Sequence, residues 1–306
     1  MELLAGAGTT TSECAEDIGC PEGGPCSSEK ILQAIEGFAD AVPARQEIGL
    51  SPLLPTEDSA EAEAVRAAAA ALNCNSESCV IKHPKFRTFA VRGGVTSQDI
   101  KKELDTRFKA EGPRDSLALL SNTHIDATMQ RWARLFPEFF PCPFAMMDFD
   151  RTKESFATID ILNVLAGKEP VTLGSSIGTV MRPCTCFGCV VNTDVSSGRG
   201  KHWVAVFVDC RGPEWTVEYF NSAGNPPPRP MTEWLTRTCV KLCTKNPTTV
   251  IVVTDLDHQE SQTECGLYAM YYIRRRLEGT PVKFFFEQLV PDAAMTAFRQ
   301  HVFRIS

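Results

Sequence analysis

The sequence predicts an α+β fold, in which a helical N-terminal third precedes a part that mixes helices with strands. Three observations support this prediction. Helical patterns follow one another up to Gly112-Pro113, strand-like runs cover residues 201–222 and 248–255, and an amphipathic helical run begins at Cys265. Helices and strands mixed without a regular alternation are typical of α+β proteins.

Residues 1–112 are expected to form a helical arm domain. After an acidic beginning rich in Gly, Ser, Ala and Pro, helical patterns cover residues 30–41, 59–72 and 97–110. Ser59 suits a helix N-cap, because its side-chain oxygen can accept a free backbone N–H, and the acids after it favour the positive end of the helix dipole. Gly112-Pro113 is expected to end the last helix and the domain.

Residues 113–306 are expected to form the core domain, beginning with a helix over 126–136. The run 201–222 reverses direction at Arg211-Gly212 and is therefore predicted to be a β-hairpin. Residues 248–255 are continuously apolar and rich in β-branched side chains, as in a buried strand. Helical spacing between these runs predicts one further helix, with Met231, Leu235, Thr238 and Leu242 on one face.

Composition indicates a globular protein of 306 residues, 43% of them hydrophobic and 23% charged. The net charge of −7 and the absence of a basic block argue against a specific nucleic-acid partner. No apolar run reaches the roughly 20 residues of a membrane span, so no membrane partner is expected. The 13 cysteines are an odd number without a framework spacing, which indicates mostly free thiols in a reducing compartment.

Cys265 is expected in the first turn of a helix that continues to Leu277. Apolar side chains recur on one face, and the arginines of residues 274–276 in the last turn favour the negative end of the dipole. A thiol in the first turn experiences the positive end and free backbone N–H groups, which favour the thiolate. Taken alone, the position of Cys265 fits a buried structural thiol better than a nucleophile, because free cysteine is among the most buried residue types.

His202 is the best candidate base among five histidines. If the hairpin turns tightly at Arg211-Gly212, Asn221 lies directly opposite His202, with Cβ atoms about 5 Å apart. The asparagine oxygen is then expected to accept a hydrogen bond from Nδ1–H, which leaves Nε2 free as the base. Asp209 is excluded as the partner, because seven residues of extended strand separate it from His202 by about 23 Å.

The order His202-Trp203, Asn221, Gln259, Cys265-Gly266 resembles the sites of adenovirus protease and of the SUMO- and ubiquitin-like-protein proteases. The likeness is closer still to the polyprotein-processing cysteine proteases of the African swine fever virus type. It extends over residues 74–306, through SESCVI, MMDF, FGCVVNTD, GKHWVA, EYFNSAGN and SQTECG.

This resemblance implies a papain-like core with Cys265 as nucleophile, His202 as general base and acid, and Asn221 as the residue that orients the imidazole. A glutamine would complete the oxyanion hole with the backbone N–H of the cysteine. Gln259 matches the family spacing, and Gln262 in the same loop competes with it.

The resemblance further implies cleavage of viral structural polyproteins after Gly-Gly-Xaa-type sites during virion maturation. The expected locations are assembly sites in the host cytoplasm and the virion. Trp203 is the candidate for a roof that excludes larger side chains. No cofactor is expected, and the oligomeric state is left open.

Two other functions stay open at the level of sequence. One is removal of ubiquitin- or SUMO-like modifiers, which also end in Gly-Gly, from host proteins. The other is a non-catalytic scaffold stabilised by zinc at the C-x-C-x-x-C motif of Cys184, Cys186 and Cys189. The motif lacks an obvious fourth ligand, so ordinary thiols are the better interpretation.

Overall fold

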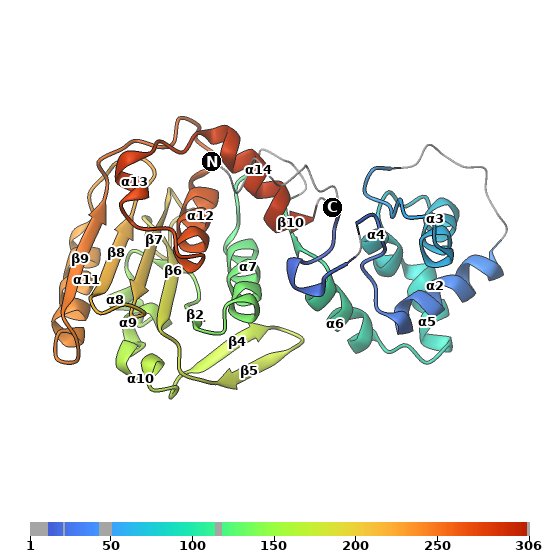
Figure 1. Ribbon diagram of the computed structural model, residues 1–306, viewed down its shortest axis with the longest axis horizontal. Coiled ribbons are helices and arrows are strands. Elements are labelled where there is room, and N and C mark those ends of the chain that lie inside the picture. The colour runs from blue at the N-terminus through green and yellow to red at the C-terminus, as the bar shows by residue number, and fades with distance from the viewer. Residues whose placement is uncertain (1–11, 21, 43–50, 114–117, 305–306) are drawn as a thin grey trace. The chain divides into compact units, whose positions relative to one another are not determined.

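The structure is a computed structural model that describes residues 12–20, 22–42, 51–113 and 118–304 (Figure 1). The chain forms two compact units. Among the described residues, the first unit comprises those up to 113 together with 175–177 and 300–304, and the second comprises 118–174 and 178–299. No helix in these ranges has the length and apolar character needed to cross a membrane.

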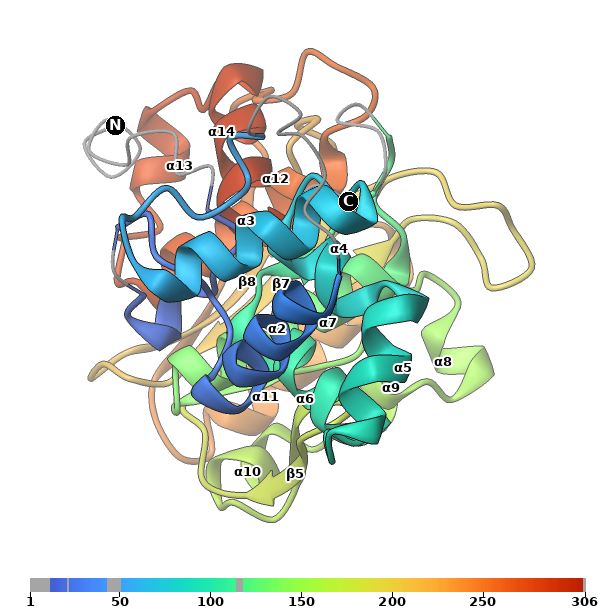
Figure 2. The same ribbon diagram turned by 90° about the vertical axis from the view of Figure 1, so that its right-hand side faces the viewer.

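The first unit is mainly helical, and α2 packs against both α3 and α5 (Figure 2). Its core consists of the apolar faces of these helices, with Phe38 edge-on against Phe86 and Phe89. Its elements are η1 (Glu16–Ile18), α2 (Glu29–Ala41), α3 (Ala60–Leu72), α4 (Glu77–Lys82), α5 (Pro84–Arg92), α6 (Ser97–Arg107), β1 (Ala110–Glu111) and β10 (Phe303–Arg304).

The helices predicted near residues 30–41 and 59–72 are confirmed, and Ser59 caps α3 by accepting the N–H of Ala62 at 3.3 Å. The third predicted helix is shorter than expected. It ends at Arg107 because Phe108 is extended, and the chain then forms β1. Residues 300–304, expected in the core domain, belong to the first unit because β10 pairs with β1 in parallel.

The second unit is built on a sheet with the strand order β2-β6-β7-β8-β9 (Figure 1). A further strand, β3, also pairs with β6. The pairs β6–β7 and β7–β8 are antiparallel, whereas β2–β6 and β8–β9 are parallel. Mixed pairing among helices confirms the predicted α+β class. The strands are β2 (Phe139–Pro141), β3 (Ala145–Met146), β6 (Cys186–Asn192), β7 (Trp203–Asp209), β8 (Trp215–Phe220) and β9 (Thr248–Val253), beside a separate hairpin of β4 (Pro170–Gly174) and β5 (Gly178–Met181).

Two long helices cover the two faces of this sheet. On one face, Phe220 of β8 stacks on Tyr272 of α12, with ring centroids 4.5 Å apart. On the other, Phe187 of β6 lies against Trp234 of α11. The helices of this unit are α7 (Asn122–Leu135), α8 (Phe149–Thr152), α9 (Ser155–Thr158), α10 (Ile161–Leu165), α11 (Arg229–Leu242), α12 (Cys265–Leu277), α13 (Phe284–Glu287) and α14 (Asp292–Val302), whose last residues continue into the first unit.

A buried polar cluster fixes α12 against the sheet. Glu218 of β8 is fully buried and accepts hydrogen bonds from Arg276 Nε at 2.9 Å and Nη2 at 2.7 Å, and from the Tyr272 hydroxyl at 2.7 Å. Arg276 Nη2 also lies 3.2 Å from a carboxylate oxygen of Asp209 on β7. Because α12 is anchored at its C-terminal half, the position of its first residue, Cys265, relative to β7 is also determined.

The prediction of a buried strand at residues 248–255 is only partly correct. β9 forms, but it is an edge strand bonded to β8 alone, and most of its side chains are partly exposed. The helix predicted over 126–136 begins earlier, at Asn122, because Ser121 forms a capping box with His124.

Candidate active site

Cys265 lies at the N-terminal end of α12 with only 4% of its surface exposed. Burial is the largest influence on the thiol and raises its pKa, and the nearby carboxylate of Glu264 acts in the same direction. Hydrogen bonds to the sulfur from the backbone N–H groups of Trp203, Gly266 and Cys265 itself lower the pKa without reversing the net shift. The helix end alone therefore does not produce a thiolate, and deprotonation needs a base.

His202 is the residue before Trp203, whose backbone N–H reaches the Cys265 sulfur. Its Nε2 lies 2.8 Å from Oδ1 of Asn221. An amide oxygen can only accept, so Nε2 carries the proton and the lone pair of the neutral imidazole is on Nδ1. The sequence predicts the opposite assignment, with Nδ1 bonded to the asparagine, and that prediction is wrong. The nitrogen that can accept a proton is Nδ1.

The reason is the register of the hairpin. Ala205 faces Phe220, where the predicted register places Glu218. The connection over residues 210–214 is longer than the assumed two-residue turn. A shift of two residues keeps every side chain on its expected face. His202 and Asn221 become diagonal neighbours just beyond the strand ends, and the imidazole spans the longer separation with its far nitrogen.

The amide of Asn221 is buried and held on both sides. Besides His202, Oδ1 accepts the backbone N–H of Ala223 at 3.0 Å. Nδ2 donates to the carbonyl of Asn225 at 3.0 Å and to the Tyr219 hydroxyl at 3.2 Å. With all four positions of the amide used, its oxygen stays directed at the imidazole and fixes the tautomer.

The two candidate glutamines differ in their surroundings. Gln259 is tied to the residue that follows Asn221: its backbone N–H donates to the Ser222 carbonyl at 3.0 Å, and its Oε1 accepts from the Ser222 hydroxyl at 2.8 Å. Its Nε2 donates to the carbonyl of Ser261 at 2.6 Å, which leaves one amide hydrogen for another acceptor. Gln262 belongs to the same loop and is exposed, whereas Gln259 is only partly exposed.

Trp203 lies over the beginning of α12. A Cβ atom on Gly266 would approach Trp203 Cδ1 to 3.3 Å and Leu120 Cβ to 3.2 Å, so a side chain at this position would be crowded. The indole also packs edge-on against Phe144, with ring centroids 6.2 Å apart. Glycine after Cys265 therefore allows an aromatic ring to stand close to the thiol.

The sequence interpretation missed an ion pair directly before the cysteine. Glu264 and Arg299 of α14 are both buried, and Arg299 Nη2 lies 3.2 Å from Glu264 Oε2. Arg299 Nη1 also donates to the carbonyl of Ala118 at 3.1 Å. An acid preceding the cysteine was the available signal, but its partner is 35 residues away in sequence. Only the fold brings the two charges together.

Known proteins resemble this chain in sequence and in fold. Residues 189–305 match the model of the Ulp1 protease family, C-terminal catalytic domain. Over its full length, the chain is 41% identical to a cysteine protease of African swine fever virus, and the match covers 100% of both proteins. The chain belongs to this family of cysteine proteases. A crystal structure of the African swine fever virus protease is similar as well, with a TM-score of 0.79, 41% identity and 97% coverage of each chain.

Membership of this family makes the protein an enzyme, so the alternative of a non-catalytic zinc scaffold is wrong. The three cysteines of that hypothesis serve the core of the protease. Cys186 and Cys189 are three positions apart in β6, so their side chains leave opposite faces of the strand. Cys184 precedes the strand and is buried, and burial raises the pKa of all three thiols.

Proposed function

We propose that the protease cleaves structural polyproteins after Gly-Gly-Xaa-type sequences, with Cys265 as nucleophile, His202 as general base and acid, and Asn221 as the orienting residue. The observation that supports this most directly is the 2.8 Å contact between His202 Nε2 and Asn221 Oδ1, next to a buried thiol at a helix N-terminus. Nucleophile, base and orienting group are the three parts that acyl transfer by a thiol requires.

The reaction follows from the tautomer. Nδ1 of His202 takes the thiol proton, and the Cys265 sulfur attacks the scissile carbonyl carbon. The oxyanion receives hydrogen bonds from the backbone N–H of Cys265 and from the second amide hydrogen of Gln259. The imidazolium then protonates the departing amine, which leaves a thioester. Water activated by Nδ1 hydrolyses the thioester and restores the thiol.

The preference for glycine rests on the surroundings of the thiol. The indole of Trp203 stands close to Gly266, beside the nucleophile. A substrate segment that passes beneath this ring has room for backbone but little room for side chains. Glycine fits such a channel, because it lacks a Cβ and lets the backbone approach closely.

The relatives in African swine fever virus support a viral setting for this activity. In this proposal the substrates are viral structural polyproteins, cut during virion maturation at assembly sites in the host cytoplasm and in the virion. The helical first unit, which includes residues 300–304, acts as an arm, and the second unit acts as the protease core. The reaction as written uses side-chain and backbone groups of the chain together with water, and no cofactor.

The proposal is tested by incubating the purified protease with the structural polyproteins of its virus and mapping the products by mass spectrometry. We expect cuts after Gly-Gly-Xaa that disappear in Cys265→Ser and His202→Ala, both of which should remain folded. Full activity in Cys265→Ser would contradict the proposal.

A second candidate function is the removal of ubiquitin-like modifiers. A protein of African swine fever virus that is 41% identical to this chain bears the name SUMO-1 cysteine protease. The same preparation is given modifier conjugates in parallel. Faster release of modifiers than of polyprotein fragments would favour this second function.

A further inference from the structure

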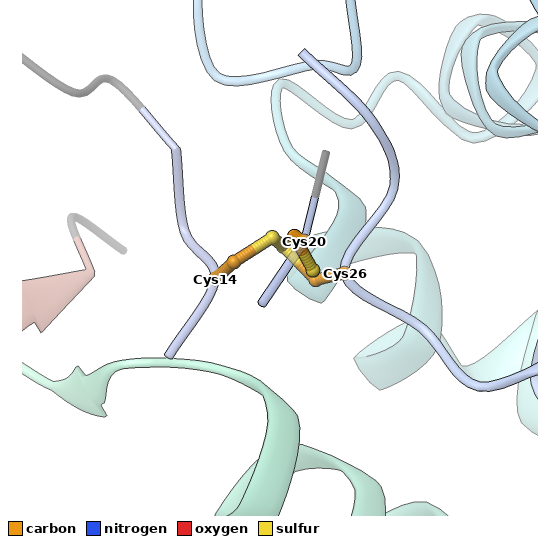
Figure 3. Close-up of side chains that lie close together, drawn as sticks. All are labelled: Cys14, Cys20 and Cys26. Carbon is orange, nitrogen blue, oxygen red and sulfur yellow. A yellow bond between two sulfur atoms is a disulfide. The ribbon is translucent and has the colours of Figure 1, made fainter. Parts of the chain in front are cut away.

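The first unit contains a cluster of three cysteines that the proposed proteolysis does not use. The sulfur atoms of Cys14, Cys20 and Cys26 all lie within 4.8 Å of one another. Cys14 and Cys26 form a disulfide, and Cys20 is a free thiol beside it (Figure 3). We propose that, once this disulfide is reduced, the three thiolates bind one soft divalent cation, with zinc as the natural occupant.

Backbone contacts hold two of the three positions independently of the disulfide. Cys14 forms a β-bridge with Phe108, flanked by a hydrogen bond from the N–H of Ala15 to the carbonyl of Arg107 at 2.9 Å. The N–H of Cys26 donates to Glu77 Oε2 at 2.8 Å, and its carbonyl accepts from Arg107 Nε at 2.6 Å. Reduction therefore leaves the two sulfurs near one another.

A tight turn brings the third sulfur back to this pair. Gly19 follows η1 with φ of 56°, the left-handed conformation that glycine adopts without strain. The Cys20 thiol then lies 3.5 Å from the carbonyl of Pro25, the residue before Cys26. Cys20 is only half-buried, whereas the other two cysteines are buried. A cation can therefore approach from the side of Cys20.

The dimensions of the cluster fit zinc. Four ligands around zinc with Zn–S distances of about 2.3 Å place thiolate sulfurs about 3.8 Å apart. All three sulfurs lie within 4.8 Å of one another, so the more distant ones need to approach by at most about 1 Å, while those of Cys14 and Cys26 separate once their bond is reduced. Rotation about the Cα–Cβ bonds allows both movements. Water completes the tetrahedron. Thiolates are soft ligands, and they select zinc over calcium or magnesium.

A positive charge near the cluster favours the metal-bound state. Three thiolates and one divalent cation carry a net charge of −1, and the guanidinium of Arg107 lies beside them. Arg107 Nε donates to the carbonyl of Cys26 at 2.6 Å, which holds this positive charge beside the cluster. A bound cation offsets the cost of deprotonating the thiols, because metal binding releases their protons.

The disulfide and the metal exclude each other, because both use the sulfurs of Cys14 and Cys26. A dithiol reductant transfers two electrons to the disulfide, becomes a disulfide itself and leaves two protein thiols. One zinc ion then displaces three protons from Cys14, Cys20 and Cys26. The redox state of the surroundings thus decides whether this part of the first unit is held together by a sulfur–sulfur bond or by a metal.

The test uses the full-length chain, reduced with a phosphine, freed of reductant without oxygen and titrated with zinc chloride. Native mass spectrometry counts bound ions, and cobalt(II) in place of zinc reports thiolate ligands by its charge-transfer absorption. We expect one ion per chain. Cys20→Ser should weaken binding more than about tenfold, since changes in the second shell alone reach that size.

Cys243→Ser is the matched control, because Cys243 is an exposed free thiol in the second unit. It should leave the affinity unchanged. A reduced chain that takes up no zinc, or affinity that Cys20→Ser does not alter, would overturn the proposal. Because the readout is metal binding, the result does not depend on whether the proposed proteolysis is correct.

Discussion

The surroundings of Asn221 require an amide, because its Nδ2 donates hydrogen bonds that a carboxylate cannot donate. Nδ2 of Asn221 donates to the carbonyl of Asn225, so Asn221→Asp would bring two acceptors together in a buried position. We expect a loss of about 1–3 kcal/mol in the free energy of unfolding. Urea unfolding followed by tryptophan fluorescence measures it.

Asn246→Asp is the matched control for this change. The amide of Asn246 also donates to a carbonyl, that of Pro213 at 2.7 Å, but this hydrogen bond is exposed and water can replace it. A loss in Asn221→Asp no larger than in Asn246→Asp would show that the buried amide is not required.

The two glutamines of the loop before Cys265 give a second prediction for single residues. Gln259 is anchored through Ser222 to the segment of Asn221, and one hydrogen of its amide is left for the oxyanion. Gln259→Ala should lower kcat by about 10²–10³, the usual effect of removing one oxyanion donor, and Gln262→Ala should leave kcat near that of the unchanged protease. Steady-state cleavage of a Gly-Gly-Xaa peptide measures both. Equal losses would contradict the assignment.

At the level of elements, the beginning of α12 depends on an ion pair with α14. Arg299→Met would leave the carboxylate of Glu264 buried without its partner, next to the thiol. Because that carboxylate already contributes to the raised pKa of Cys265, the pKa should rise further. We expect the rate of thiol alkylation to reach its plateau at higher pH, together with a loss of stability.

The double variant Glu264→Gln/Arg299→Met separates this effect from simple unfolding. It removes both charges, so the alkylation profile should return toward that of the unchanged protease. Lys283→Met, which breaks an exposed pair with Glu287, is the control. A profile in Arg299→Met that matches the control would contradict the prediction.

The elements with strong local signals are those that the sequence predicts well. Ser59 and the apolar face behind it define α3, and α12 begins at Cys265 and ends at the expected Leu277. The hairpin of β7 and β8 is also predicted, but its register is not. The register depends on the length of the connection over 210–214, where Gly212-Pro213 is compatible with more than one loop.

For the molecule as a whole, stability should depend on the pH through the first unit. Burial raises the pKa of Glu77 from 4.5 to about 7, although hydrogen bonds from Ser27 and Cys26 favour the carboxylate and lower the pKa. Between these values the folded chain keeps a proton that the unfolded chain has released. The stabilisation is therefore complete below pH 4.5 and decreases as the pH rises through 7. Glu77→Gln should flatten this dependence.

Hydrogen exchange of α2 and α4, measured over this pH range, tests the prediction, with rates corrected for intrinsic exchange. Tryptophan fluorescence is not suitable, because all four tryptophans lie in the second unit. The same pH dependence in Glu77→Gln as in the unchanged chain would contradict the assignment.

The first unit is not continuous in sequence, which leads to a prediction about fragments. Arg304 Nη1 donates to the carbonyls of Lys109 at 2.6 Å and Leu104 at 3.3 Å, and Phe303 packs against Gly112. A fragment of residues 1–113 lacks these contacts. We expect faster hydrogen exchange in α6 of the fragment than in the full chain, and an intermediate rate in Arg304→Ala. Equal rates in all three would show that β10 is dispensable.

Local patterns in the sequence were enough to establish the fold class, the principal helices and strands, and the candidates Cys265, His202 and Asn221. These depend on periodicity, helix caps and a characteristic order of residues. The folded chain alone shows which imidazole nitrogen faces Asn221, that Glu264 pairs with Arg299, and that residues 300–304 belong to the first unit. Each of these depends on contacts between segments distant in sequence, whose geometry is set by packing and by the lengths of the intervening loops.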